Sequence, residues 1–316
     1  MTNDYEKIQA MIRNVERVIV GKRAMVELVV TALLAEGHIL LEDVPGVGKT
    51  MMVRAFAKSI EGDFKRIQFT PDLLPSDVIG VSIYNPKELS FEFRPGPIMG
   101  NIILADEINR ASPRTQSALL ESMEEQSMTV DGNTIVLEKP FLVIATQNPI
   151  EHEGTYPLPE AQLDRFLLKL KMGYPSREEE LTVLQRAIGQ EPIEQIEAVM
   201  TRQQLVQLQR AVKEIAVQDH VKHYIIDCAR ATREHPSIQL GVSPRGSIAL
   251  MKACQAYAFI QGRAFVTPDD VQYMMPFVCT HRIVLGPEAM YDGKDGEQII
   301  REVIQQIPVP VERMSR

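Results

Sequence analysis

Residues 38–57 read HILLEDVPGVGKTMMVRAFA. The first four form an apolar run that is typical of a buried strand, and the residues after Thr50 suit a helix. Between them lies a loop, from Asp43 to Thr50, that contains two glycines. Strand, glycine-containing loop and helix in this order are typical of a phosphate-binding loop in a parallel α/β sheet. The stretch therefore indicates both a fold class and the first part of a candidate site.

Each residue type in this loop suits phosphate binding. Gly46 and Gly48 let backbone N–H groups turn toward phosphate oxygens, and the helix N-terminus adds partial positive charge. Lys49 can reach the β and γ phosphates, and Thr50 can ligate magnesium. Asp43 stands where a glycine usually begins such a loop, and the alternative is a surface turn that happens to contain Gly-Lys-Thr. The loop residues that we expect to contact nucleotide are Pro45, Gly46, Val47, Gly48, Lys49, Thr50 and Met51.

Two later apolar runs end in polar residues that fit the same site. Ile102–Ala105 precedes Asp106 and Glu107; we expect Asp106 to hold magnesium and Glu107 to orient and deprotonate the attacking water. Phe141–Ala145 leads to Asn148, whose amide could position that water or sense the γ phosphate. Each feature alone also has an ordinary explanation: a solvated strand end for the carboxylates, and a turn before proline for the amide.

The remaining pattern of the first half predicts a sheet with two projections. Apolar runs at 64–69 and 166–170 add strands without alternation, as in a parallel sheet covered on both faces. Two alternating segments, 81–93 and 128–136, predict hairpins that interrupt this scheme. Because both lie between strands of the sheet, we expect them to project from the core.

Helical segments dominate after Pro175. Ser176 and Thr267 are each suited to cap a helix, because acidic residues follow in the first turn. We therefore predict two domains: a nucleotide-binding α/β core at residues 1–175 and a small all-helical lid at 176–316.

The composition, 45% apolar and 24% charged, is that of an ordinary globular protein. A formal charge of −8 and a pI near 5.4 argue against a broad electrostatic surface for nucleic acid or anionic lipid. Three scattered cysteines show neither a disulfide framework nor zinc-ribbon spacing, which favours a reducing cytoplasm. No export signal and no apolar run of about 18 residues is visible, so we expect no membrane span.

These motifs, in this order, resemble the AAA+ superfamily of ATPases and, within it, the MoxR family. The resemblance spans nearly the whole chain, and the order of its motifs makes it specific. The segments that carry it are Leu41–Thr50, Asp106–Ala111, Gln116–Glu121, Ala145–Pro149, Leu163–Phe166 and Ser243–Arg245.

The resemblance implies a homo-oligomeric ring, usually hexameric, in which ATP lies between subunits and is hydrolysed to ADP with Mg²⁺. It implies that Arg165 is a finger supplied to the neighbour's γ phosphate and that Arg245 is a sensor on the lid. Val20 and Gly21 resemble the segment that lines the adenine pocket. The two hairpins resemble inserts that place the chain near the magnesium chelatase and MCM subunits. The residues that would act within one subunit are Lys49, Thr50, Asp106, Glu107 and Asn148.

MoxR proteins commonly act with a partner that carries a von Willebrand factor A domain, in protein remodelling, maturation or the insertion of a metal or cofactor. The resemblance implies such a role here. Two alternatives stay open: a nucleotide-dependent scaffold with little turnover, and a DNA-linked motor. Glu107 argues against the first, and the acidic charge balance argues against the second.

Overall fold

The computed structural model describes residues 2–42, 44, 46–148, 154–186 and 192–310. Its centre is a five-stranded sheet in which every neighbouring pair of strands is parallel. All five apolar runs of the sequence form its strands, which confirms the expected parallel α/β core. In sheet order the strands are β2 (Phe64–Gln68), β5 (Ile102–Asp106), β8 (Leu142–Gln147), β1 (Ile39–Glu42) and β9 (Leu168–Leu170).

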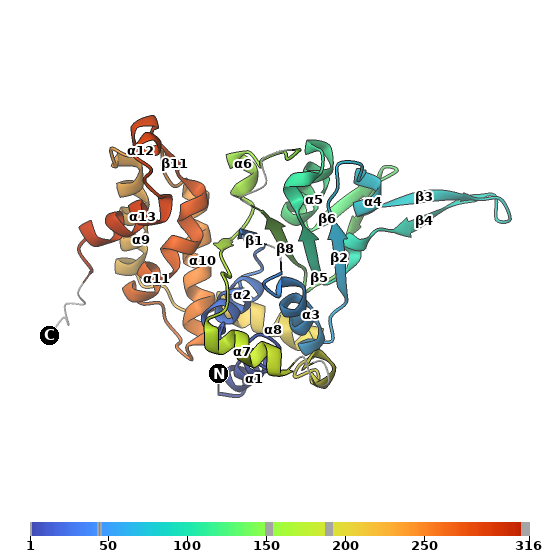
Figure 1. The fold of residues 1–316 in the computed structure, drawn as a ribbon, viewed down its shortest axis with the longest axis horizontal. Coiled ribbons are helices and arrows are strands. Elements are labelled where there is room, and N and C mark those ends of the chain that lie inside the picture. The colour runs from blue at the N-terminus through green and yellow to red at the C-terminus, as the bar shows by residue number, and fades with distance from the viewer. Residues whose placement is uncertain (1, 43, 45, 149–153, 187–191, 311–316) are drawn as a thin grey trace.

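Helices cover both faces of the sheet (Figure 1). Side chains alternate between the faces, so Ile39 and Leu41 of β1 join one apolar cluster while Leu40 joins the other. The helices on the first face are α1 (Thr2–Val18), α2 (Arg23–Leu34) and α3 (Lys49–Ser59). Those on the second are α4 (Pro75–Ile79) and α5 (Pro113–Glu125). Short helical segments at η1 (Pro97–Met99), η2 (Ile108–Arg110) and α6 (Glu160–Leu163) connect these elements.

Both expected hairpins form. The first pairs β3 (Gly80–Asn85) with β4 (Ser90–Pro95), and in Figure 1 it extends well beyond the core. The second pairs β6 (Ser127–Val130) with β7 (Asn133–Val136). Its tight turn places Asp131 and Gly132 at φ values of 51° and 78°, and glycine adopts such a backbone without steric cost.

The segment after residue 176 is mainly helical, as expected. Capping boxes at Ser176 and Thr267 start α7 (Arg177–Arg186) and α11 (Pro268–Cys279) in the way the sequence indicates. One feature corrects the expected all-helical lid: β10 (Ile238–Leu240) pairs with β11 (Val284–Leu285) in an antiparallel ribbon. The other elements are η3 (Pro192–Gln195), α8 (Arg202–Lys213), α9 (Asp219–Glu234), α10 (Pro244–Ile260), η4 (Thr280–Arg282), α12 (Pro287–Tyr291) and α13 (Gly296–Gln306).

These helices do not all lie in one place. In Figure 1, α9 to α13 form a group beside the β9 edge of the sheet, whereas α7 and α8 lie beneath the core with α1. The apolar cluster on the first face of the sheet is continuous through α8, α9, α10 and α11. The division into domains at residue 175 stays a prediction.

A buried histidine, His38, joins the sheet to the helix behind it. Its Nε2 lies 3.0 Å from the carbonyl of Met123, and its Nδ1 accepts a hydrogen bond of 3.0 Å from the Val143 N–H. Because Nδ1 is an acceptor, Nε2 carries the proton and donates to the carbonyl, so the ring is neutral. Burial lowers the pKa of His38 to about 4 from its ordinary value near 6.5.

We expect His38 to make the folded state sensitive to acid. The unfolded chain binds a proton at His38 below about pH 6.5, whereas the folded chain does so only near pH 4. The free energy of unfolding therefore falls as pH drops through this window, by about 3 kcal/mol for this group. Urea unfolding at several pH values should show a steeper loss for the wild type than for His38→Gln. Parallel curves for the two proteins between pH 6.5 and 4 would contradict this role.

Candidate nucleotide-binding site

The loop after β1 leads directly into α3. Gly46 and Gly48 have φ values of 86° and 92°, a backbone region that residues with side chains rarely adopt. Gly48 is the N-cap of α3, and the first bond of the helix runs from the Met52 N–H to the Gly48 carbonyl, 3.1 Å. The N–H groups of the first turn lie beyond the reach of the helix's own carbonyls, which makes this helix start suited to an anion.

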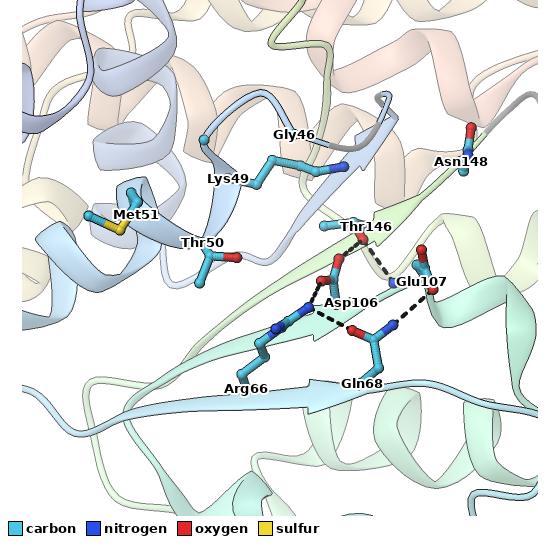
Figure 2. A pocket seen from close by; sticks show the side chains of 11 residues that line it. Gly46, Lys49, Thr50, Met51, Arg66, Gln68, Asp106, Glu107, Thr146 and Asn148 are labelled. Atoms are coloured by element: carbon cyan, nitrogen blue, oxygen red, sulfur yellow. Dashed lines mark hydrogen bonds and ion pairs between the residues drawn. The ribbon is translucent and has the colours of Figure 1, made fainter. Parts of the chain in front are cut away.

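A cavity of about 390 Å³ lies at this helix start. Figure 2 shows that its polar side chains come from the carboxyl ends of neighbouring strands and from the start of α3. Ligands of open parallel sheets bind at such strand ends. Eight expected site residues meet here. The lining residues are Gly46, Gly48, Lys49, Thr50, Met51, Arg66, Gln68, Asp106, Glu107, Thr146 and Asn148.

The hydroxyl of Thr146 on β8 contacts the Asp106 carboxylate and the Glu107 backbone at the end of β5. Thr146 Oγ1 donates to Asp106 Oδ1 at 2.6 Å and accepts the Glu107 N–H at 2.8 Å. Glu107 has a φ of 57°, which costs a residue other than glycine on the order of 1 kcal/mol or more. Its Oε2 lies 3.3 Å from Nε of Arg110. The Thr146 hydroxyl therefore fixes the Asp106 carboxylate and the backbone turn that orients the Glu107 side chain.

Thr50 and Asp106 suit a magnesium ion. In Figure 2 the hydroxyl of Thr50 points toward the carboxylate of Asp106. Hydroxyl and carboxylate oxygens are the hard donors that Mg²⁺ takes, usually together with waters and phosphate oxygens. Both residues line the same cavity as Lys49, so a bound metal would lie beside the phosphates.

A second, mainly apolar cavity of about 220 Å³ adjoins the first, because Gly46, Gly48 and Met51 line both. Val20 and Val47 are among its lining residues, as expected for the surroundings of a base. Gly21 is not among them. Its φ is 72°, a conformation that favours glycine, and it lies against the side chain of Glu179 in the first turn of α7. Pro45 lies outside the described residues.

Arg165 and Arg245 lie apart from the cavity and close to each other. Arg165 Nη2 is 3.1 Å from Glu124 Oε2, and Arg245 Nη2 is 2.9 Å from Glu124 Oε1. Arg245 Nε also lies 3.7 Å from Asp164 Oδ2. Neither arginine lines the cavity that holds Lys49 and Glu107. The structure thus brings the two arginines together but does not bring them to the phosphate-binding loop of their own chain.

Residues 38–168 match the ATPase family associated with various cellular activities (AAA), and residues 230–303 match the AAA lid domain. The chain is 43% identical over 316 residues to the chaperone MoxR1 of Mycobacterium tuberculosis, an alignment that covers 96% of this chain and 82% of that protein. The chain belongs to the MoxR family of AAA+ ATPases. It is 63% identical over 304 residues to the uncharacterized protein YeaC of Bacillus subtilis, which covers 96% of this chain and 95% of YeaC.

A crystal structure from Cytophaga hutchinsonii, of a protein assigned as an ATPase, has the same fold as this MoxR-family chain. The TM-score is 0.92 at 39% identity, over 98% of this chain and 97% of that one. The MoxR-family chain is therefore an ATPase, with a parallel sheet core and an AAA lid. Among the described residues, no helix combines the length and the apolar character needed to cross a membrane.

Sequence reasoning gave no site role to three lining residues of the MoxR-family site: Thr146 on β8, and Arg66 and Gln68 on β2. Arg66 Nη2 donates to Asp106 Oδ2 at 2.7 Å and to Gln68 Oε1 at 2.7 Å. Gln68 Nε2 donates to Glu107 Oε2 at 2.8 Å. Figure 2 shows this chain of contacts across the floor of the cavity. The expected magnesium ligand Asp106 and the expected base Glu107 thus each have a partner on β2.

A signal for the two β2 residues was present in the sequence. Although we expect residues 64–69 to form an apolar run, β2 reads Phe-Lys-Arg-Ile-Gln, and its largely exposed pattern is that of an edge strand. β2 pairs with β5 so that Gln68 lies opposite Asp106. Once the order of the strands is known, polar residues at that end of β2 must lie beside the carboxylates.

Proposed function

We propose that this chain hydrolyses ATP to ADP and phosphate in the cavity at the end of the sheet, with Mg²⁺ bound there. One observation carries the proposal: the start of α3, Lys49 and both carboxylates line a single cavity. Hydrolysis needs positive charge on the phosphates and a group that orients and deprotonates water. The cavity holds both, and the apolar cavity beside it offers room for a base.

Each polar group has a distinct part in this proposal. Lys49 and the N–H groups of α3 bind the phosphates, and Thr50 and Asp106 hold Mg²⁺, which neutralises charge that develops on the phosphate oxygens. Glu107 takes a proton from the attacking water. Asn148, at the end of β8, orients that water or contacts the γ phosphate.

The positions of Arg165 and Arg245 support a shared site between subunits. Both lie at Glu124, outside the cavity of their own chain. In a ring, head-to-tail contacts place one surface of each subunit against a different surface of the next. In our proposal the chain forms such a ring, as a homo-oligomer, and the arginine pair of one subunit completes the nucleotide site of its neighbour.

Turnover in this ring drives the remodelling or maturation of other proteins. MoxR1, to which the chain is 43% identical, is named a chaperone, and this supports the assignment. A protein with a von Willebrand factor A domain is the partner we propose. Co-purification of such a protein with the chain in the presence of ATP, and its loss with ADP, would test this part of the proposal.

A nucleotide-dependent scaffold with little turnover is the second candidate function. The contacts of Arg66 with Asp106 and of Gln68 with Glu107 favour it, because they occupy the carboxylates that hydrolysis requires. Turnover by the wild type separates the two functions. Hydrolysis that stays near the uncatalysed rate at every protein concentration would favour the scaffold.

Lys49→Ala should weaken ATP binding by about 10-fold to 100-fold, because a hydrogen bond to a charged group contributes about 1.5–3 kcal/mol. Titration with a fluorescent ATP analogue measures this loss directly. Arg54→Ala is the matched control, since Arg54 is exposed on the same helix and lines neither cavity. Unchanged affinity in Lys49→Ala would mean that nucleotide binds elsewhere.

A further inference from the structure

Glu124 contacts both arginines that lie outside the cavity of their own chain. It is in the last turn of α5, and each of its oxygens forms an ion pair with a different guanidinium: Oε2 with Arg165 Nη2 at 3.1 Å and Oε1 with Arg245 Nη2 at 2.9 Å. Because separate oxygens are used, both contacts exist at the same time. One carboxylate thus joins an arginine that precedes β9 in the core to an arginine at the start of α10.

This arrangement sets the distance between two positive charges. Guanidinium groups paired with the two oxygens of one carboxylate lie near each other, where their repulsion is appreciable without the negative charge between them. The side chains of Arg165 and Arg245 are 28% and 54% exposed. Long, partly exposed side chains can adopt many rotamers, and the surrounding packing does not restrict these two arginines to one. The ion pairs with Glu124 restrict their rotamers instead.

The other side of the pair is anchored by a buried arginine, Arg282, whose side chain is 3% exposed. Arg282 Nε donates to Asp164 Oδ1 at 2.6 Å, and its Nη2 donates to the Phe166 carbonyl at 2.7 Å. Asp164 Oδ2 lies 3.7 Å from Arg245 Nε. Arg245 is therefore flanked by two carboxylates, one of which is fixed in place by a buried cation.

We propose that Glu124 is a positioning residue that aligns Arg165 and Arg245 as one unit, ready for a nucleotide bound by the neighbouring subunit. The inference rests on the proposed function, in which these arginines act on that nucleotide. Glu124 itself touches no reacting atom. Its effect on hydrolysis is exerted through the two guanidinium groups, so it disappears once they are removed.

A double-mutant cycle tests this dependence. Single-turnover hydrolysis of radiolabelled ATP, with the full chain in excess, keeps slow variants measurable. We expect Glu124→Ala to slow hydrolysis by about 10-fold to 100-fold, since small misplacement of a catalytic group has effects of this size. ATP affinity should change by less than about 2-fold. In a chain that also carries Arg165→Ala and Arg245→Ala, adding Glu124→Ala should change the rate by less than about 2-fold.

Two controls separate positioning from folding. Glu121→Ala removes an exposed carboxylate one turn earlier on α5 and should leave the rate unchanged. Glu124→Gln keeps the shape without the charge, and its rate should lie between those of the wild type and Glu124→Ala. Equal losses from Glu124→Ala with and without the arginines, or no loss with them, would overturn the inference. Wild-type hydrolysis by the chain that lacks both arginines would instead overturn the shared site itself.

Discussion

Glu107→Gln should lower ATP turnover by about 10²-fold to 10⁴-fold, which is the usual contribution of a general base. The amide cannot take a proton from water, yet it keeps the size of the side chain and can still contact Gln68. ATP affinity should therefore be retained. Phosphate release measures the first effect, and titration with a fluorescent ATP analogue measures the second.

The matched control for this substitution is Glu138→Gln. Glu138 is an exposed carboxylate that pairs with Arg202, and it lies outside the cavity. Its variant should hydrolyse ATP at the wild-type rate. Should Glu107→Gln also retain that rate, Glu107 would not be the base, and the water would have to be activated by another group.

Arg165→Ala should lower turnover by about 10³-fold to 10⁵-fold, the range for an arginine that neutralises transition-state charge in phosphoryl transfer. The nucleotide affinity of a single subunit should be little changed, because Arg165 lies outside the cavity of its own chain. Hydrolysis under single-turnover conditions and nucleotide titration measure the two quantities.

Arg230→Ala is the control for Arg165→Ala. Arg230 is 64% exposed and forms a pair with Glu234 on α9, and exposed pairs of this kind contribute little to stability. Its removal should leave turnover unchanged. Equal rates for Arg165→Ala and the wild type would show that the arginine has no part in the chemistry.

Much of the core could be predicted because local sequence determines it. Most strands that carry the site are short apolar runs. Such a run can be recognised from its own sequence, without knowledge of the strands it pairs with. Gly46 and Gly48 occupy backbone conformations that glycine favours. The loop, its helix and the strand ends with Asp106 and Asn148 therefore follow from residues that are adjacent in the chain.

The missed features depend on contacts between distant segments. Arg66 contacts Asp106 only because β2 is the neighbour of β5 in the sheet. The order of strands in a sheet cannot be predicted from the sequence of a single strand. Glu124 meets Arg245 across more than a hundred residues, through the packing of α10 beside the core. The antiparallel ribbon β10–β11 is likewise formed by two short segments that give no local signal.

The most direct test of the shared site is an equimolar mixture of Arg165→Ala and Glu107→Gln, assayed for ATP turnover at concentrations where the wild type is fully assembled. In a head-to-tail ring, a subunit with Glu107 can neighbour one with Arg165, so random mixing restores about a quarter of the sites. We expect turnover well above that of either variant alone, approaching about a quarter of the wild-type value. A mixture no more active than its components, under conditions where mixed rings form, would contradict a site completed by the neighbouring subunit.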